Sequence, residues 1–129
     1  MPELPEVETV ARDLRGLVVG ATIVGAAGDW PRLIGSHASI AAFADAVEGR
    51  RIEAVGRRAK LVVVELSGHA ALTIHLKMTG QLFVVSSGTP ADRHVHLALA
   101  LDDGRELRFR DIRKFGRVGL WPRDPLSGA

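Results

Sequence analysis

The chain has 129 residues, 47% of them hydrophobic, and a formal net charge of +2, values typical of one globular domain with a buried core rather than a disordered tail. No apolar run approaches the ~20 residues that cross a bilayer, so no membrane segment is expected. The sequence contains no cysteine, which excludes disulfides and thiolate metal sites within these residues and fits a reducing cytosol.

The first half of the sequence reads as two helices separated by a strand and a loop. Apolar residues such as Val7, Val10 and Leu14 recur at spacings of three and four, which is the pattern of an amphipathic helix. Ser36 or Ser39 is a candidate N-cap for the second helix. In chain order, the expected elements are a helix over 3–18, a strand over 21–27, a loop over 28–37 and a helix over 38–47.

From residue 50 onward the apolar period is two, which predicts strands. Asp103-Gly104 lies between two alternating segments and is a strong signal for a two-residue hairpin. Expected strands cover 51–55, 60–66, 71–76, 81–85 and 117–121, with alternation also around Leu97–Leu101 and Leu107–Phe109 and a loop over 86–93. The predicted fold class is therefore mainly β with flanking helices: an antiparallel β-sandwich with an N-terminal α-helix.

Basic residues gather in two stretches of an otherwise balanced chain. Such clusters indicate a polyanionic partner, and they are equally consistent with a solvated basic face. The first stretch contains Arg50, Arg51, Arg57, Arg58 and Lys60; the second contains Arg105, Arg108, Arg110, Arg113, Lys114 and Arg117.

The opening residues, Met1-Pro2-Glu3-Leu4-Pro5-Glu6, can carry covalent chemistry. If Met1 is removed, the nitrogen of Pro2 becomes a secondary amine, and α-amino groups titrate near ~8. Such an amine can attack an aldehyde-level carbon and form a Schiff base, and Glu3 and Glu6 could transfer protons. The alternative is that proline followed by glutamate simply begins a helix.

Five segments, in order, resemble the formamidopyrimidine-DNA glycosylase family of base-excision repair, and the resemblance runs over essentially the whole chain. It implies the N-terminal-domain fold of those glycosylases, and the opening resembles the branch that acts on oxidised purines. The segments are Pro2-Glu-Leu-Pro-Glu-Val-Glu-Thr9, Arg57-Arg-Ala-Lys60, His75-Leu-Lys-Met-Thr-Gly80, His94-Val-His96 and Asp111-Ile-Arg-Lys-Phe-Gly116.

By this resemblance, four residues take part in catalysis. Pro2 is the nucleophile that attacks C1′ of the damaged nucleotide, and the resulting imine allows strand cleavage by β- and then δ-elimination. Glu3 transfers a proton to the sugar ring oxygen, and Glu6 helps to organise the pocket. Lys60 lies close to the lesion and its phosphates. From the residues alone, Glu6 could instead favour the helix dipole, and Lys60 could protect a strand edge.

The resemblance also implies a DNA-contacting set. Met78 and Phe115 would wedge into the duplex where a base has been removed, and Arg113 would hydrogen-bond its widowed partner. Backbone phosphates would be contacted by His75, His94 and His96, with Lys77 adding positive charge. The alternatives are that Met78 and Phe115 are core residues, and that His94-Val95-His96 holds a metal. No third ligand at a convincing spacing supports a metal, and none is expected.

The chain departs from the family pattern in length and at two positions. Family members are usually longer by about as much again, with a helix-two-turn-helix region and a four-cysteine zinc finger. We therefore expect residues 1–122 to be the catalytic domain alone, and 123–129 to begin a linker to those regions. No cofactor is expected in this chain. Lys77 stands where some members have glycine, and Val95 where some have aspartate.

The expected function is a bifunctional DNA glycosylase/AP lyase that removes formamidopyrimidines and 8-oxoguanine from double-stranded DNA, and that also acts at abasic sites. A monomer is expected, cytoplasmic and associated with a bacterial nucleoid. The N-terminus lacks the pattern of a secretory signal. Three alternatives stay open: a glycosylase for oxidised pyrimidines, a DNA-binding module without catalysis, and a small sandwich that binds an unrelated ligand.

Overall fold

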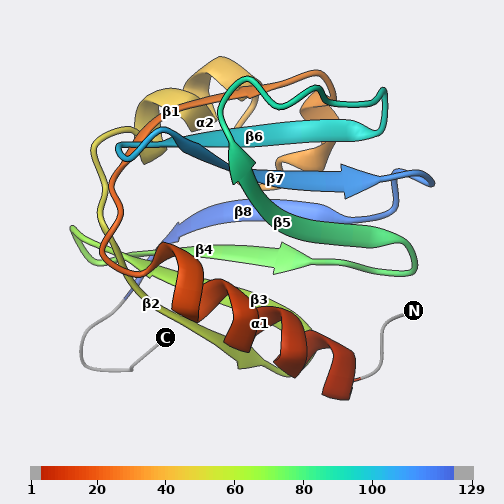
Figure 1. The fold of residues 1–129 in the computed structure, drawn as a ribbon, viewed down its shortest axis with the longest axis horizontal. Helices are drawn as coiled ribbons and strands as arrows, with labels where there is room; N and C mark the ends of the chain where they lie inside the picture. The colour runs from red at the N-terminus through yellow and green to blue at the C-terminus, as the bar shows by residue number, and fades with distance from the viewer. Residues whose placement is uncertain (1–3, 124–129) are drawn as a thin grey trace.

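Two four-stranded antiparallel sheets and two helices make up the fold in a computed structural model that describes residues 4–123 (Figure 1). The antiparallel sandwich expected from the sequence is confirmed. In chain order the elements are α1 (Leu4–Val18), β1 (Ile23–Gly28), a 3-10 turn (Pro31–Leu33), α2 (Ile40–Val47), β2 (Ile52–Arg58), β3 (Leu61–Leu66), β4 (Ala70–His75), β5 (Gly80–Ser86), β6 (Val95–Leu101), β7 (Arg105–Asp111) and β8 (Arg117–Pro122). Pro2, Glu3 and all of the expected linker except Arg123 lie outside the described residues.

The core lies between the two sheets, whose strand orders are β1-β6-β7-β5 and β2-β3-β4-β8. Alternate residues of each strand point inward, as the period of two predicts. Leu72 and Ile74 of one sheet meet Leu97, Leu107 and Phe109 of the other around a small apolar space. All five are at most 3% exposed, so the two sheets hold each other through a dry interface.

Each helix covers part of one sheet. α1 packs on β2 and β3 through a buried stripe that includes Ala11 and Leu14, and α2 packs on β1 through Phe43. The Ser39 hydroxyl accepts a hydrogen bond of 3.0 Å from the backbone N–H of Ala42, which confirms one of the two expected N-caps.

The structure refines three local expectations. The loop expected over 28–37 contains the short 3-10 turn, which Pro31 begins. β2 runs to Arg58, so Lys60 lies in the tight turn before β3 instead of opening that strand. The hairpin after β6 has three loop residues, 102–104, of which Gly104 adopts the left-handed φ of 83° that the last position of such a loop requires.

The sheet order places two connections side by side at one end of the sandwich, on the right in Figure 1. β4 pairs with β8, ending at His75 opposite Arg117, and β5 pairs with β7, with Gly80 opposite Asp111. Residues 76–79 connect β4 to β5, and residues 112–116 connect β7 to β8. Both segments, called the crossover loops here, therefore bridge the two sheets from neighbouring starting points.

Candidate nucleic-acid interface

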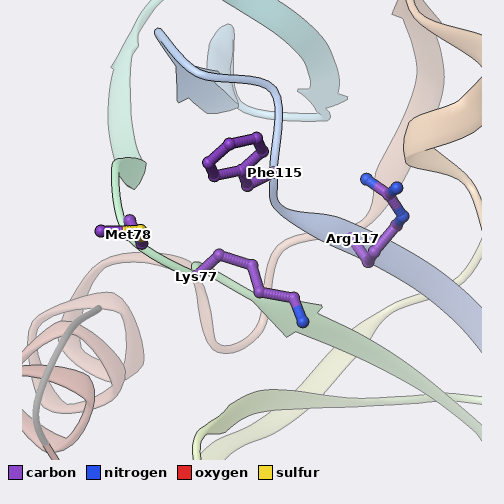
Figure 2. A pocket seen from close by; sticks show the side chains of 4 residues that line it. All are labelled: Lys77, Met78, Phe115 and Arg117. Atoms are coloured by element: carbon purple, nitrogen blue, oxygen red, sulfur yellow. The ribbon is translucent and has the colours of Figure 1, made fainter.

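The crossover loops enclose an open pocket of about 370 Å³, lined by Lys77, Met78, Phe115 and Arg117. Figure 2 shows Lys77 and Met78 on the segment that follows β4, and Phe115 on the segment that leads into β8. Met78 is 51% exposed and Phe115 is 44% exposed, so neither is the core residue that the alternative interpretation required. Large apolar side chains exposed together beside cations indicate a binding surface.

Arg113 connects the two exposed apolar side chains. Its guanidinium carbon lies 4.9 Å from the centre of the Phe115 ring, and its Nη1 lies 3.9 Å from Met78 Sδ. The first contact is within the range of a cation–π interaction. The structure thus brings together the three side chains that the sequence placed in one DNA-contacting set.

Asp111 holds the base of both crossover loops, a role that sequence reasoning missed. Its buried carboxylate accepts a hydrogen bond from the Thr79 hydroxyl and from the backbone N–H groups of Arg113 (3.1 Å), Phe115 (3.0 Å) and Gly116 (2.8 Å). Burial alone would raise the pKa of Asp111, but the hydroxyl and the three N–H groups outweigh it, and the net pKa is lowered. Asp111 is therefore an ionised anchor.

Glycine is required at two positions of the crossover loops because the backbone passes very close to other atoms. A Cβ on Gly80 would fall 2.5 Å from the carbonyl oxygen of Leu76. A Cβ on Gly116 would fall 2.4 Å from Cζ of Phe109 and 2.9 Å from the carbonyl oxygen of His75. Only hydrogen fits at these distances, so both loops turn tightly against the sandwich.

Two lysines in the crossover loops adopt a left-handed backbone. Lys77 has a φ of 55° and directly precedes Met78, and Lys114 has a φ of 56° and directly precedes Phe115. This conformation is uncommon for residues other than glycine. It gives a physical reason why position 77 suits glycine in some members of the family that this chain resembles.

His75 lies beside the crossover loops with two lysines close by. Its Nδ1 accepts a hydrogen bond of 3.0 Å from the backbone N–H of Lys77. Burial lowers its pKa below the ordinary value of 6.5, and the charges of Lys77 and Lys60 lower it further. An acceptor Nδ1 requires that the neutral ring carry its proton on Nε2, so His75 presents an N–H donor at neutral pH.

The titration of His75 provides a test. We expect its pKa in the folded chain, followed by NMR, to lie below 6.5, the value of the unfolded chain. Because the folded form binds protons less readily, its contribution to stability is present above pH 6.5 and is lost as the pH falls toward the folded pKa. His75→Asn keeps an acceptor near Nδ1 and should remove this part of the pH dependence. An unchanged pH dependence in that variant would contradict the assignment.

The start of α1 faces the same end of the sandwich. Glu8, in the second turn of α1, accepts a hydrogen bond of 3.1 Å from Nε of Arg57 near the end of β2. Glu6 is exposed two residues earlier in α1, and the turn that holds Lys60 follows β2. The start of α1, the turn between β2 and β3, and the crossover loops thus lie at one end of the fold, on the right in Figure 1.

Of the other two histidines in the DNA-contacting set, only His96 departs from the sequence-based interpretation. His96 is 3% exposed, with Nδ1 2.8 Å from Asp29 Oδ1 and Nε2 3.1 Å from the backbone oxygen of Asp111. Both of its nitrogens are occupied inside the protein, so the expected phosphate contact by His96 is replaced by a supporting role beneath Asp111. His94 is partly exposed just before β6, where its carbonyl accepts from the N–H of Asp111 at 2.9 Å.

Part of the second basic stretch is neutralised inside the fold. Arg108 is 5% exposed and donates to Glu106 and to the carbonyls of Thr89 and Pro90. Arg110 pairs with Asp92. The stretch therefore offers less positive surface than its composition suggests, and its charge at the pocket comes from the residues after β7.

Trp30 is a second residue that sequence reasoning did not single out. Lys114 Nζ lies 5.7 Å, and the guanidinium carbon of Arg117 lies 5.3 Å, from the centre of its ring. The Trp30 and His96 rings pack edge to face, with their centres 5.7 Å apart. Trp30 thus holds two cations beside the pocket. A lone tryptophan in a loop with glycine and proline gives no such signal in the sequence.

Within residues 4–123, no group of three or more histidine, aspartate or glutamate side chains is arranged to hold a metal ion. Over the same residues, no helix has the length and apolar character that crossing a membrane requires.

The fold and its pocket together define a sandwich domain with exposed wedge-shaped side chains beside cations, an arrangement suited to a nucleic acid. Residues 1–118 match the family model described as "Formamidopyrimidine-DNA glycosylase N-terminal domain". Formamidopyrimidine-DNA glycosylase of Herpetosiphon aurantiacus is 52% identical over 128 residues, covering 98% of this chain and 46% of the relative. The Bacillus subtilis protein of the same name is 43% identical, with 94% and 44% covered.

Solved structures agree. A complex of Lactococcus lactis Fpg with DNA containing an abasic site superposes with a TM-score of 0.90 at 30% identity, covering 98% of this chain and 46% of that one. A complex of the same protein with FAPY-dG-containing DNA gives 0.89, with 97% and 46% covered. The chain belongs to the formamidopyrimidine-DNA glycosylase family of DNA-repair enzymes. It spans a little under half the length of the curated relatives that it matches.

Proposed function

We propose that residues 1–122 are the catalytic N-terminal domain of a DNA glycosylase/AP lyase that removes oxidised purines. The single observation that carries the proposal is the cluster of Met78, Arg113 and Phe115 on two neighbouring loops, in which Met78 and Phe115 are exposed and Arg113 contacts both. A base that leaves the stack leaves a gap, and the two apolar side chains suit that gap while the arginine suits the widowed base.

One amine, the nitrogen of Pro2, is sufficient for both base removal and strand cleavage. The Pro2 nitrogen forms a bond to C1′ as the bond from C1′ to the base breaks, and the base departs with the bonding electrons and a proton. Glu3 protonates the ring oxygen as the sugar opens, which leaves an iminium ion. The iminium acidifies the 2′ hydrogen, whose loss expels the 3′ phosphate, and a second elimination expels the 5′ phosphate. Glu6 organises the pocket.

Phosphate contacts are assigned to the residues around His75. Lys60 and Lys77 lie close enough to His75 to lower its pKa, so the three groups form one cationic and donor-rich corner. The Nε2–H of His75 can donate to a phosphate oxygen, and His94 is hydrogen-bonded through its carbonyl to the backbone of Asp111. These contacts position the strand without reading its sequence.

The relatives support the proposed substrate class. A neighbouring structure holds FAPY-dG-containing DNA and another holds an abasic site, which supports an oxidised-purine substrate in double-stranded DNA and the lyase step. A zinc finger, if present in the parent protein, would lie outside these residues, because the chain has no cysteine. We propose a monomer that works in the cytoplasm on nucleoid DNA.

Covalent trapping tests the function. Borohydride should link the chain, freed of Met1, to duplex DNA that contains an abasic site, because it reduces the iminium to a stable amine. Intact mass establishes whether Met1 is absent, and undamaged duplex is the control. Absence of a covalent species at low salt and high protein concentration would remove the lyase assignment. Binding to the DNA without trapping would favour a DNA-binding module without catalysis. Preferential excision of oxidised pyrimidines would favour the oxidised-pyrimidine glycosylase alternative.

Met78→Ala separates base extrusion from strand cleavage. We expect excision of an oxidised purine to fall at least about tenfold, since the wedge offsets an unstacking cost of a few kcal/mol. Cleavage at a pre-formed abasic site should change little, because no base must be extruded there. Leu17→Ala, at a similarly exposed apolar residue on α1, is the control. Equal losses in both assays would indicate a structural role for Met78.

A further inference from the structure

The side chain of Asp111 accepts hydrogen bonds from both crossover loops. Its Oδ1 accepts from the Thr79 hydroxyl in the 76–79 loop and from the N–H of Arg113 in the 112–116 loop, while its Oδ2 accepts from Phe115 and Gly116. Charge-assisted hydrogen bonds of this kind are stronger than neutral ones and fix geometry.

The backbone of Asp111 is also held in place by hydrogen bonds to the sandwich. The backbone N–H of Asp111 donates to the carbonyl of His94, and its carbonyl accepts from Nε2 of His96, whose other nitrogen bonds Asp29. Asp111 also ends β7 opposite Gly80 at the start of β5. Its position is therefore set by the sandwich and does not depend on either loop.

We propose that Asp111 is a positioning residue that locks the two crossover loops into one rigid unit, with the Thr79 hydroxyl as the link to the loop that carries Met78. This inference rests on the proposed function only for its effect on DNA; the mechanical coupling stands by itself. Separate loops would each lose conformational freedom when they enter the duplex. Loops that are already coupled present Met78 and Phe115 at a fixed spacing, which lowers the entropic cost of inserting both.

Thr79 provides the sharper test, because its replacement removes the hydrogen bond from the 76–79 loop to Asp111 and leaves those from the 112–116 loop in place. Thr79→Val keeps the shape of the side chain but removes the hydroxyl, and Thr79→Ser keeps the hydroxyl as the matched control. The three N–H bonds from residues 113, 115 and 116 to Asp111 remain in both variants.

The first measurement needs no DNA. We expect NMR relaxation of the Met78 methyl group to show a lower order parameter in Thr79→Val than in the native chain, while the Phe115 and Gly116 amides keep their protection from hydrogen exchange. Thr79→Ser should behave like the native chain in both. An unchanged Met78 methyl in a folded Thr79→Val chain would overturn the proposal. If Thr79→Val does not fold, Thr79→Ala serves in its place.

The second measurement uses DNA. Thr79→Val should lower excision of an oxidised purine by about tenfold, equivalent to about 1.4 kcal/mol, with cleavage at a pre-formed abasic site within about twofold of native. A purely structural role would lower both activities together, and that result would also overturn the proposal. If the native chain shows neither activity, the proposed function fails, while the NMR measurement still decides the coupling.

Discussion

Retention of Met1 is expected to reduce borohydride trapping on abasic DNA by at least about 100-fold, within the range that loss of a group acting in the chemical step produces. The physical reason is that Met1 converts the Pro2 nitrogen into an amide, which has no nucleophilic lone pair. Pro2→Gly, with Met1 removed, should also lose most of the trapping, because the secondary amine that gives an iminium without further protonation is gone. Both chains can be compared in one gel assay, normalised by intact mass.

Lys60 provides the matched control for this prediction. Lys60→Ala removes another amine near the site but leaves Pro2 intact, so trapping should persist at low salt. Binding to DNA should be weaker and depend less steeply on salt, as expected for a lost phosphate contact. Full trapping by Pro2→Gly, together with its loss in Lys60→Ala, would make Lys60 the nucleophile instead.

Gly116→Ala is expected to destabilise the fold by about 2 kcal/mol, within the ~1–3 kcal/mol range for overpacking. The added methyl group would lie 2.4 Å from the buried Phe109 ring and 2.9 Å from the carbonyl oxygen of His75. The carbonyl of His75 belongs to β4, which is paired on both sides, so moving it would cost hydrogen bonds. The 112–116 loop must therefore shift instead, and Phe115 shifts with it. A lower urea midpoint and a loss of base excision should therefore appear together.

Gly56→Ala is the control for that substitution. Gly56 lies in β2, where an added Cβ meets nothing within 4 Å. Its free energy of unfolding should stay within about 0.5 kcal/mol of the native chain. Similar destabilisation by the two variants would show that the cost arises from replacing a strand or loop glycine in general and not from the close approach at Gly116.

The sequence predicted most of the fold because local patterns and tertiary packing agree. Alternation of Val62, Val64 and Leu66 signals one buried face, and these residues are buried in β3. The Ser39 cap and the hairpin around Gly104 depend on local chemistry and were also found. Boundaries were less accurate, as for Lys60, since a hairpin turn is set by how far two strands remain paired.

The site was only partly predictable. Met78 and Phe115 were expected at the surface from their glycine-bearing surroundings and the family resemblance. The burial of Arg108 and His96, by contrast, could not be predicted, because their hydrogen-bond partners come from segments far away in the sequence. Asp111 was quoted within a motif but received no role for the same reason: its contacts with Thr79 exist only once the sheets are assembled.

The sheet order has a mechanical consequence. Each crossover loop begins on one sheet and ends on the other, and both do so between the same two strand pairs, β4–β8 and β5–β7. A change in the spacing of the sheets at this end would therefore alter the distance that both loops span, although one loop runs from the β4 sheet to the β5 sheet and the other runs back. The positions of Met78 and Phe115 are therefore both tied to the spacing of the two sheets at this end of the sandwich.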